Sequence, residues 1–276
     1  MTEAVDAARA VRRAFDRAAA SYDGAAGVQR EICARLAALM QEYPPTAPPR
    51  RIIDAGCGTG YGLRPLAEHF PTAERLAIDF APAMLQRSRE HHPATPLCAD
   101  LQALPLRDGS VDALWSSLAL QWCDPARALR EFARVLVTDG TAWIATLGPD
   151  TLTELRQSFV QVDDAEHVLR FRPAADWALL AQAAGLGVLA ERRERCFVRA
   201  PDLRGVIAHL KGIGAHRIDA TPRRPLTRAE WRRLEHAYEA FREADGLLPA
   251  SYDVILLALR CTGTQCASGN NLRRIA

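Results

Sequence analysis

Hydrophobic and polar positions alternate along residues 50–148 in a repeating pattern of short apolar runs and longer amphipathic stretches. Short apolar runs bounded by turn residues are typical of buried strands, whereas apolar positions three or four residues apart are typical of helices. The expected strands are RRIIDA, RLAIDF, TPLCAD, VDALWSS and TAWIATL, and helices are expected from about residue 60, from about residue 82 and over 125–137. This alternation predicts an α/β fold with a mostly parallel sheet and helices on both of its faces.

An N-terminal segment precedes this alternation. Residues 8–40 have apolar side chains at helical spacing, with Ile32, Leu36 and Met40 on one face. The run YPPTAPPR at 43–50 cannot continue that helix, because proline lacks the amide hydrogen that a helix interior needs. We therefore expect a helical arm joined to the core by a proline-rich link.

The C-terminal part adds two more expected strands, GVLAERRERCFV at 187–198 and SYDVILLALR at 251–260. Two helical stretches are expected before them and a helical insertion between them. Within the insertion, four side chains share one helical stripe that we interpret as core packing and not as a ligand site: Trp231, Leu234, Tyr238 and Phe241. The expected regions are an arm and link at 1–49, a core at 50–148, a C-terminal part at 149–260 with a basic insertion at about 197–250, and a disordered tail at 261–276.

Composition excludes several classes of protein. The chain has 276 residues, 49% of them hydrophobic and 25% charged, with a formal net charge of +2, which is ordinary for a globular protein. No apolar run approaches the ~18 residues that a membrane-spanning helix needs, and the N-terminus lacks the apolar region of a secretory signal. The seven cysteines form no C-x-x-C pair, so we expect thiols in a reducing cytosol and no metal site. We expect a cytoplasmic monomer.

The most specific motif is IIDAGCGTGYG at 52–62, where a hydrophobic strand ends in Asp54 and leads through Gly56, Gly58 and Gly60 into a helix. Glycines allow a sharp turn and a close approach of the backbone to a ligand. Their G-x-G-x-G spacing differs from the G-x-G-x-x-G pattern that binds a pyrophosphate. The negative charge of Asp54 beside this turn favours an amine or a sulfonium and would repel a phosphate.

Two further acidic residues follow the next two expected strands. Asp79 comes 19 residues after Gly60, at the position where a ribose diol would be held. Asp100 ends the third strand, where its carboxylate could accept a hydrogen bond from an adenine amino group. These acids favour a ligand with a nucleoside part.

Together these segments resemble the class I S-adenosylmethionine-dependent methyltransferases. DAGCGTG matches the first motif of that superfamily, AIDF its ribose acid, CADLQALPLRDGSVD its adenine segment, and EFARVLVTDGTAWIAT its following helix and fifth strand. The resemblance implies a Rossmann-like fold with a seven-stranded sheet, and S-adenosylmethionine as cofactor with S-adenosylhomocysteine as product. The cofactor-binding residues that it implies are Tyr22, Gln29, Asp54, Gly56, Cys57, Gly58, Gly60, Asp79, Phe80, Met84, Asp100, Leu101 and Ser117.

The carboxyl end of the fourth expected strand, WSSLALQWC at 115–123, offers no obvious acid, base or nucleophile. The Pro-Pro-Tyr and Pro-Cys motifs of DNA methyltransferases are absent, and we interpret Cys123 as structural. A carboxylic acid with a pKa near ~4 is roughly 99.9% ionised at pH 7, so it needs no general base. Attack of a carboxylate on a sulfonium removes two opposite charges, which a weakly polar wall favours relative to water. The pattern favours a carboxylate acceptor that is positioned rather than deprotonated.

Four separate segments are similar to the malonyl-acyl-carrier-protein O-methyltransferases of biotin synthesis: VRRAFDRAAASYDGAAGVQ, SLALQWC, HLKGIGAHR and LPASYDVILLAL. Members of that family methylate the free carboxyl of a malonyl thioester. The resemblance implies this substrate, held on a carrier protein or on coenzyme A, and an arm that folds over the cofactor as a lid. The implied substrate-binding residues are Tyr22, Gln121, Trp122 and Lys211, and His209 and His216 are interpreted as polar residues and not as catalysts. Lys211 would pair with the malonyl carboxylate or with the phosphate of the carrier.

Residues 191–233 are strongly basic, with eleven arginines and the single lysine of the chain against five acidic residues. Such an excess of positive charge would attract an acidic carrier protein. The expected docking residues are Arg217, Arg223, Arg224 and Arg228. A solvated face and a nucleic-acid surface remain as alternatives, although no RNA-binding motif is visible, and we expect neither a nucleic-acid nor a membrane partner.

Two other functions stay open on the sequence alone, besides an RNA methyltransferase that would use the basic insertion and for which no RNA-binding motif is visible. The first is a different small-molecule methyltransferase of the same fold, acting on a quinone precursor or on a free dicarboxylic acid. The second is a protein that binds the cofactor without turnover. A comparison of thioester and free-acid substrates distinguishes the first, and tight binding without methyl transfer would indicate the second.

Overall fold

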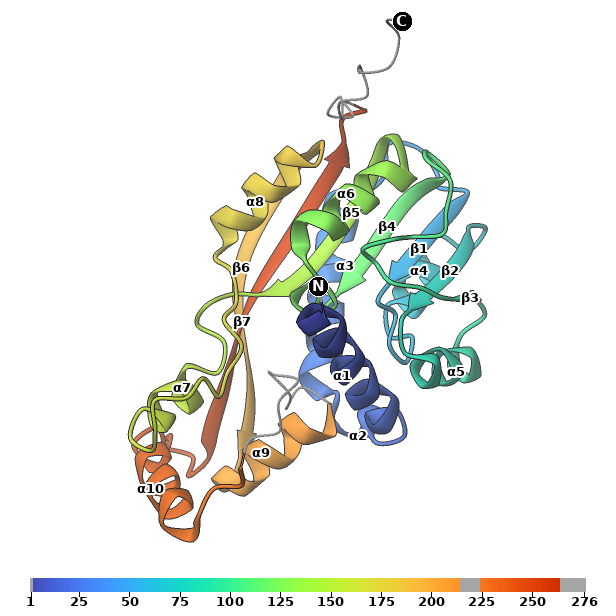
Figure 1. Cartoon of the computed structure of the whole chain (residues 1–276). Coiled ribbons are helices and arrows are strands. Elements are labelled where there is room, and N and C mark those ends of the chain that lie inside the picture. The colour runs from blue at the N-terminus through green and yellow to red at the C-terminus, as the bar shows by residue number, and fades with distance from the viewer. Residues whose placement is uncertain (1, 214–223, 264–276) are drawn as a thin grey trace, which may run out of the picture.

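The computed structural model describes residues 2–213 and 224–263, and a seven-stranded sheet forms its centre (Figure 1). The strand order is β3-β2-β1-β4-β5-β7-β6, with β7 antiparallel to both of its neighbours and the other pairs parallel. The strands are β1 (Arg51–Ala55), β2 (Glu74–Asp79), β3 (Thr95–Cys98), β4 (Val111–Ser117), β5 (Leu136–Leu147), β6 (Leu186–Ala200) and β7 (Leu248–Cys261). The mostly parallel Rossmann-like sheet expected from the sequence is confirmed.

Helices cover both faces of this sheet (Figure 1). They are α1 (Thr2–Ala18), α2 (Tyr22–Ala25), α3 (Gly27–Glu42), α4 (Leu63–His69), α5 (Pro82–His91), α6 (Pro125–Val135), α7 (Thr153–Phe159), α8 (Ala174–Ala183), α9 (Leu203–Gly212) and α10 (Arg228–Glu239), and a 3₁₀ turn lies at Leu120–Trp122. On one face, Leu36 of α3 and Leu66 of α4 share a core with Trp143 of β5. On the other face, Phe132 of α6 and Trp177 of α8 form a second core.

The arm and the insertion differ in detail from the sequence expectation. The arm is three helices and not one, because the chain turns after Ala18, where the amide of Ser21 donates to the Ala18 carbonyl. The insertion spans 201–247, since β6 and β7 extend further than the apolar runs suggested. Most of the expected tail, 264–276, lies outside the described residues.

The expected stripe of the insertion is only partly core. Leu234 and Tyr238 are fully buried, and the Tyr238 hydroxyl donates to the Pro249 carbonyl at 2.9 Å. Trp231 is half-buried at the edge of this core. Phe241 lies beyond the end of α10 at Glu239, so it does not share a helical face with the others.

The strand order determines where a ligand binds. The chain leaves β1 towards β2 on one side, while β4 lies on the other side of β1. A crevice opens outside the carboxyl ends of parallel strands where the order reverses in this way. The turns after β1, β2 and β4 therefore face one common space.

Asp124 is the N-cap of α6, which the sequence predicts over 125–137, and its Oδ1 accepts from the amides of Ala126 at 3.0 Å and Arg127 at 3.2 Å. Replacing it by alanine leaves these amides without their side-chain acceptor. Asp124→Ala is expected to lower the free energy of unfolding by about 1 kcal/mol, measured by urea denaturation. Asp124→Ser keeps an acceptor and should retain most of that stability; equal losses in the two variants would contradict the capping role.

Candidate active site

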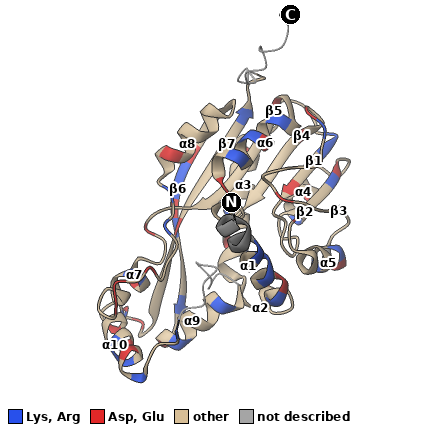
Figure 2. Ribbon diagram, in the orientation of Figure 1, with Lys and Arg blue, Asp and Glu red and all other residues tan. Residues whose placement is uncertain are grey.

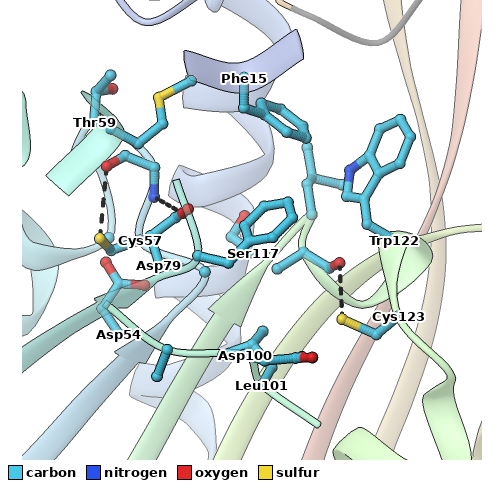
Figure 3. A pocket seen from close by; sticks show the side chains of 18 of the residues that line it. Phe15, Asp54, Cys57, Thr59, Asp79, Asp100, Leu101, Ser117, Trp122 and Cys123 are labelled. Carbon is cyan, nitrogen blue, oxygen red and sulfur yellow. Dashed lines mark hydrogen bonds between the residues drawn. The ribbon is translucent and has the colours of Figure 1, made fainter. Parts of the chain in front are cut away.

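A cavity of about 580 Å³ lies at the carboxyl ends of β1, β2 and β4, and Figure 3 shows side chains that line it. Twelve of the thirteen residues expected to bind the cofactor line this cavity. They come from the arm (Tyr22, Gln29), from the first motif (Asp54, Gly56, Cys57, Gly58), from the end of β2 and the start of α5 (Asp79, Phe80, Met84), and from the ends of β3 and β4 (Asp100, Leu101, Ser117). The structure thus gathers segments that are distant in the sequence around one space.

Gly60 is the exception, because it does not line the cavity. Its φ is +95°, and a Cβ added there would lie 2.8 Å from Ser88 Oγ of α5. This glycine lets the turn pass close to α5. Gly58 also has a positive φ of +52°, but an added Cβ would meet nothing within 4 Å and the residue lines the cavity. The two glycines therefore have different roles in the turn.

Asp79 joins the glycine-rich turn to the start of α5. Its Oδ2 accepts from the Gly58 amide at 3.0 Å (Figure 3). Its Oδ1 accepts from the Ala81 amide at 2.8 Å. Burial raises the pKa of Asp79 to about 6, against the effect of these amide donors, which favour the charged form. Each oxygen keeps a lone pair, so the carboxylate can still accept from a diol while it organises the turn.

Asp54 has no comparable support. Its side chain is buried, and Oδ2 lacks a hydrogen-bond partner within the described structure. Burial, followed by the charge of Asp79, raises the pKa of Asp54 to about 8. A buried carboxylate without a partner is costly when ionised, and a cation placed beside it removes much of that cost. The position fits the ammonium or sulfonium group of a ligand.

Other buried polar atoms around the cavity also lack partners among the described residues: Gln29 Oε1, Thr59 Oγ1 and Trp115 Nε1. Buried polar atoms in proteins are almost always hydrogen-bonded, so a cluster of unpaired ones indicates a place for a polar ligand. An amide oxygen, a hydroxyl and an indole N–H around the cavity that Asp54 also lines suit the ammonium, hydroxyl and carboxylate groups of S-adenosylmethionine. The residues present therefore fit this cofactor.

Side chains of the arm help to line the first cavity, among them Arg12 and Phe15 of α1. Phe15 of α1 makes edge-to-face contacts with Phe80 at 6.2 Å and with Trp122 at 5.5 Å between ring centroids. Asp16 Oδ1 accepts from the Ala83 amide of α5 at 3.1 Å. Phe15 was not among the expected site residues, although it lies within the quoted arm segment, because apolar periodicity alone does not separate a lid residue from a core residue.

A second cavity of about 280 Å³ adjoins the first. The two share five lining residues, which we call the junction: Phe15, Tyr22, Gln29, Leu118 and Trp122. The four residues expected to bind the substrate all line this second cavity: Tyr22, Gln121, Trp122 and Lys211. The rest of its wall is mostly apolar and comes from α7, α9, β7 and the segment 160–173.

Two leucines of this wall have strained backbones. Leu118 has a φ of 56° and Leu152 a φ of 53°, in a left-handed region that costs a non-glycine residue about 1–3 kcal/mol. Leu118 follows β4 at the junction, and Leu152 precedes α7 at the second cavity. Such strain at the edge of a cavity is typical of functional sites and is not visible in the sequence.

Tyr252 of β7 also lines the second cavity and was not expected there. Its hydroxyl lies 3.3 Å from His209 Nε2, and burial raises its pKa. His209 lines neither cavity, so its placement agrees with a polar partner of Tyr252 and not with a catalyst. The sequence pattern around Tyr252 is that of a buried strand, which conceals the one position that faces a ligand.

Cys123 lies in the wall of the first cavity, and two of the four expected docking arginines are described by the structure. Cys123 lines the first cavity, and burial raises the pKa of its thiol to about 12, so it is not a thiolate. Arg224 forms a bidentate ion pair with Glu230 at 2.5 and 2.8 Å, whereas Arg228 is exposed without an acidic partner in the described ranges. His216, Arg217 and Arg223 lie outside the described residues.

None of the helices in the described ranges combines the length and apolar character that crossing a bilayer requires. Within the same ranges, no cluster of three or more His, Cys, Asp or Glu side chains could hold a metal ion.

Gly58→Ala tests whether the turn approaches the cofactor. The substitution adds a methyl group to a residue that lines the cavity and has a φ of +52°. The strain should cost about 1–2 kcal/mol of stability, and affinity for S-adenosylmethionine should fall more than tenfold. Gly109→Ala is the matched control, because its φ is +56°, nothing lies within 4 Å and it lines none of the cavities. Calorimetry that finds the same affinity in both variants would exclude the close approach.

Asp54 predicts a pH dependence of stability. Its pKa of about 8 in the folded protein exceeds ~3.9 in the unfolded chain, so the folded state binds the proton more tightly. Its contribution is therefore fully present below about pH 4 and is lost as the pH rises through about 8. Relative to Asp54→Asn, the free energy of unfolding of the ligand-free protein should fall by about 1.4 kcal/mol per pH unit between pH 5 and 7. Urea denaturation at a series of pH values measures this fall.

The same carboxyl must ionise to pair with a cationic cofactor. Binding at pH 7 is therefore expected to release a proton, and affinity should rise between pH 6 and 8. Calorimetry in two buffers of different ionisation enthalpy measures this release. Proton release that persists in Asp54→Asn would assign it to another group.

Comparisons with known proteins agree with this geometry. The family model described as a methyltransferase domain matches residues 53–144. A malonyl-acyl-carrier-protein O-methyltransferase from Laribacter hongkongensis is 44% identical over 92% of this chain and 90% of that protein. The biotin biosynthesis bifunctional protein BioHC from Cellvibrio japonicus is 40% identical over 94% of this chain and 51% of its own length.

Among solved structures, a candidate methyltransferase from Bacillus halodurans has a TM-score of 0.58 and 17% identity, over 82% of this chain and 97% of that one. This likeness supports the fold alone. The curated relatives are similar along nearly the whole chain, including the arm and the insertion. The chain therefore belongs to the malonyl-acyl-carrier-protein O-methyltransferase family.

Proposed function

We propose that this protein transfers a methyl group from S-adenosylmethionine to the free carboxylate of a malonyl thioester, giving the methyl ester that enters biotin synthesis. The observation that carries the proposal is the junction between the two cavities. The first cavity fits a cationic nucleoside, and the mostly apolar second cavity leads away from the same five residues. An acceptor that enters through the second cavity meets the donor at this junction.

The junction residues suit an acceptor that is already ionised. S-Adenosylmethionine supplies a methyl group on a positively charged sulfur when it is bound. Phe15, Leu118 and Trp122 exclude water, which favours a step in which opposite charges disappear. Tyr22 and Gln29 offer a hydroxyl and an amide that can donate to a carboxylate, and burial raises the pKa of Tyr22, so its hydroxyl keeps its proton.

Alignment of donor and acceptor is the main contribution that these residues can make. Holding two reactants in line can supply up to ~7–11 kcal/mol of the barrier reduction in favourable cases. The backbone strain at Leu118 and the packing of Phe15 on Trp122 fix the walls of the junction. No proton has to be removed from the acceptor, so no catalytic base is assigned.

The proposed partners are an acidic acyl carrier protein or coenzyme A as holder of the malonyl group, and the proposed docking surface is the basic insertion. Arg228 supports this surface, since it is exposed without an acidic partner in the described ranges, whereas the charge of Arg224 is compensated by Glu230. We further infer a cytoplasmic monomer that uses no metal, nucleic acid or membrane. Neither a quinone precursor nor a free dicarboxylic acid, nor a role without turnover, is favoured by a particular feature.

A methyl-transfer assay with malonyl-carrier protein, malonyl-coenzyme A and free malonate side by side tests the substrate. Both thioesters should be methylated, and free malonate should react far more slowly because it leaves the second cavity empty. Formation of S-adenosylhomocysteine and of the methyl ester are the two readouts. Preference for free malonate, or binding of the cofactor without transfer to any of the three, would refute the proposal.

The rate at saturating cofactor should fall only at acid pH, near ~4, where the acceptor carboxyl becomes protonated. His209→Gln and Cys123→Ser should each keep at least a tenth of the wild-type kcat, because neither residue transfers a proton in the proposed reaction. A loss of ~10²–10⁴-fold in either variant is the scale expected for a proton-transfer residue and would contradict this chemistry.

A further inference from the structure

A third hollow, of about 630 Å³, lies between α9 and α10 on the insertion. We call it the α9–α10 groove. Arg204 and Lys211 of α9 line one side of it, and Arg228, Trp231 and Arg232 of α10 line the other. Positively charged residues mark both helices in Figure 2. The groove is therefore a basic channel with an aromatic wall.

Six of the ten cations that the structure describes within residues 191–233 have an acidic partner. Acidic side chains outside that segment pair with Arg192, Arg193, Arg195, Arg199 and Arg204, and Glu230 within it pairs with Arg224. In the described part of this segment, four cations have no acidic partner: Lys211, Arg228, Arg232 and Arg233. Three of these four line the α9–α10 groove, so the unpaired charge is concentrated there.

The acidic residue in the groove does not cancel this charge. Glu235 accepts a hydrogen bond from Trp231 Nε1, and it lies 3.6 Å from Arg204. The guanidinium of Arg204 also lies over the Trp231 ring, 5.5 Å from its centroid. Glu235 is thus engaged by Trp231 and Arg204, which leaves Lys211, Arg228 and Arg232 facing the groove without a counter-charge among the described residues.

The groove is continuous with the substrate side of the active site. Ile207 and Lys211 line both the groove and the second cavity. Lys211 is exposed at this boundary, whereas Leu210 beside it is buried in the second cavity. A path therefore leads from the junction, through an apolar cavity, to a cationic groove at the surface.

We propose that the α9–α10 groove binds the phosphate of the phosphopantetheine arm that carries the malonyl group. This inference rests on the proposed function. Phosphopantetheine has an uncharged pantetheine part between the thioester and its phosphate. That phosphate is present both on a carrier protein and in coenzyme A. With the carboxylate at the junction, the uncharged part occupies the second cavity and the phosphate reaches Lys211, Arg228 and Arg232. The planar guanidinium of arginine can donate two hydrogen bonds to a phosphate, and the ammonium of lysine adds a compact positive charge.

The test uses two small thioesters that differ only in the phosphate, malonyl-pantetheine and malonyl-4′-phosphopantetheine. In the wild type, the phosphate should lower the KM about five- to tenfold, the scale of one or two exposed charge-assisted contacts. This ratio should shrink at high salt, because exposed charges are screened within about 8–10 Å. An equal KM for the two thioesters would overturn the inference while leaving methylation of the malonyl group, and so the proposed function, intact.

The double variant Arg228→Gln, Arg232→Gln should bring the ratio of the two KM values close to one. Arg130→Gln is the matched control, an exposed arginine on α6 that has no acidic partner in the described structure and lines none of the cavities; it should keep the wild-type ratio. A double variant that keeps the ratio, but has a raised KM for malonyl-carrier protein, would mean that these arginines contact the acidic surface of the carrier. That result would overturn a phosphate site.

Direct binding keeps the inference separate from turnover. If no malonyl thioester is methylated, the proposed function fails, and calorimetry with 4′-phosphopantetheine alone then decides about the groove. Binding by the wild type and by Arg130→Gln, but not by the double variant, would support the phosphate site. Absence of binding to the wild type would overturn it.

Discussion

The active site depends on two buried carboxylates, Asp54 and Asp79, at the ends of neighbouring strands. Asp79 is compensated, because backbone amides donate to both of its oxygens and so hold the glycine-rich turn against α5. Asp54 is not, because its buried Oδ2 has no hydrogen-bond partner among the described residues. An uncompensated buried charge is expensive, which is why burial raises the pKa of Asp54 to about 8. Without a ligand the carboxyl of Asp54 is therefore largely protonated at neutral pH. A cation placed beside it would favour its ionised form, so the site suits a sulfonium better than a phosphate.

The second half of the site follows from the same electrostatics. An acceptor that is already a carboxylate can attack a sulfonium methyl group without first losing a proton. The junction has apolar walls and hydrogen-bond donors and no base assigned to this role. The proposed donors, Tyr22 and Gln29, come from the arm, so the arm helps to line both the first cavity and the second. Gly212 at the end of α9 approaches the arm closely, since an added Cβ would lie 2.7 Å from Ala25 Cβ. A shift of the arm would therefore displace α9, which helps to line the second cavity.

The sequence was most informative where function follows from strand ends. The acids and glycines expected in the site come at the ends of predicted strands, so their place at the ligand edge could be inferred. Gly60 is the exception, because its close neighbour Ser88 lies on α5 and the sequence does not show that contact. Tyr252 and Phe15 could not be inferred, because one side chain of a buried strand or of an amphipathic helix faces a cavity without changing the periodicity. The ion pairs were equally hidden: Arg192 pairs with Glu42, 150 residues away in the sequence, and Arg193 with Asp253, so local charge counts overstated the free charge.

The cofactor cavity and the basic insertion lie on different parts of the sheet, so the insertion can contact a substrate without contacting the cofactor. Short strands β1 to β4 end at the cofactor cavity, whereas β6, with 15 residues, and β7, with 14, extend further and carry α9 and α10 (Figure 1). Salt bridges join the arginines of β6 to acidic residues of β7, α3 and the loops, so these arginines add little unpaired positive charge to the extension. What remains unpaired is concentrated at the far end of the substrate path. A ligand with a carboxylate at one end, an uncharged middle and a phosphate at the other matches that order of surfaces, and a free dicarboxylic acid does not.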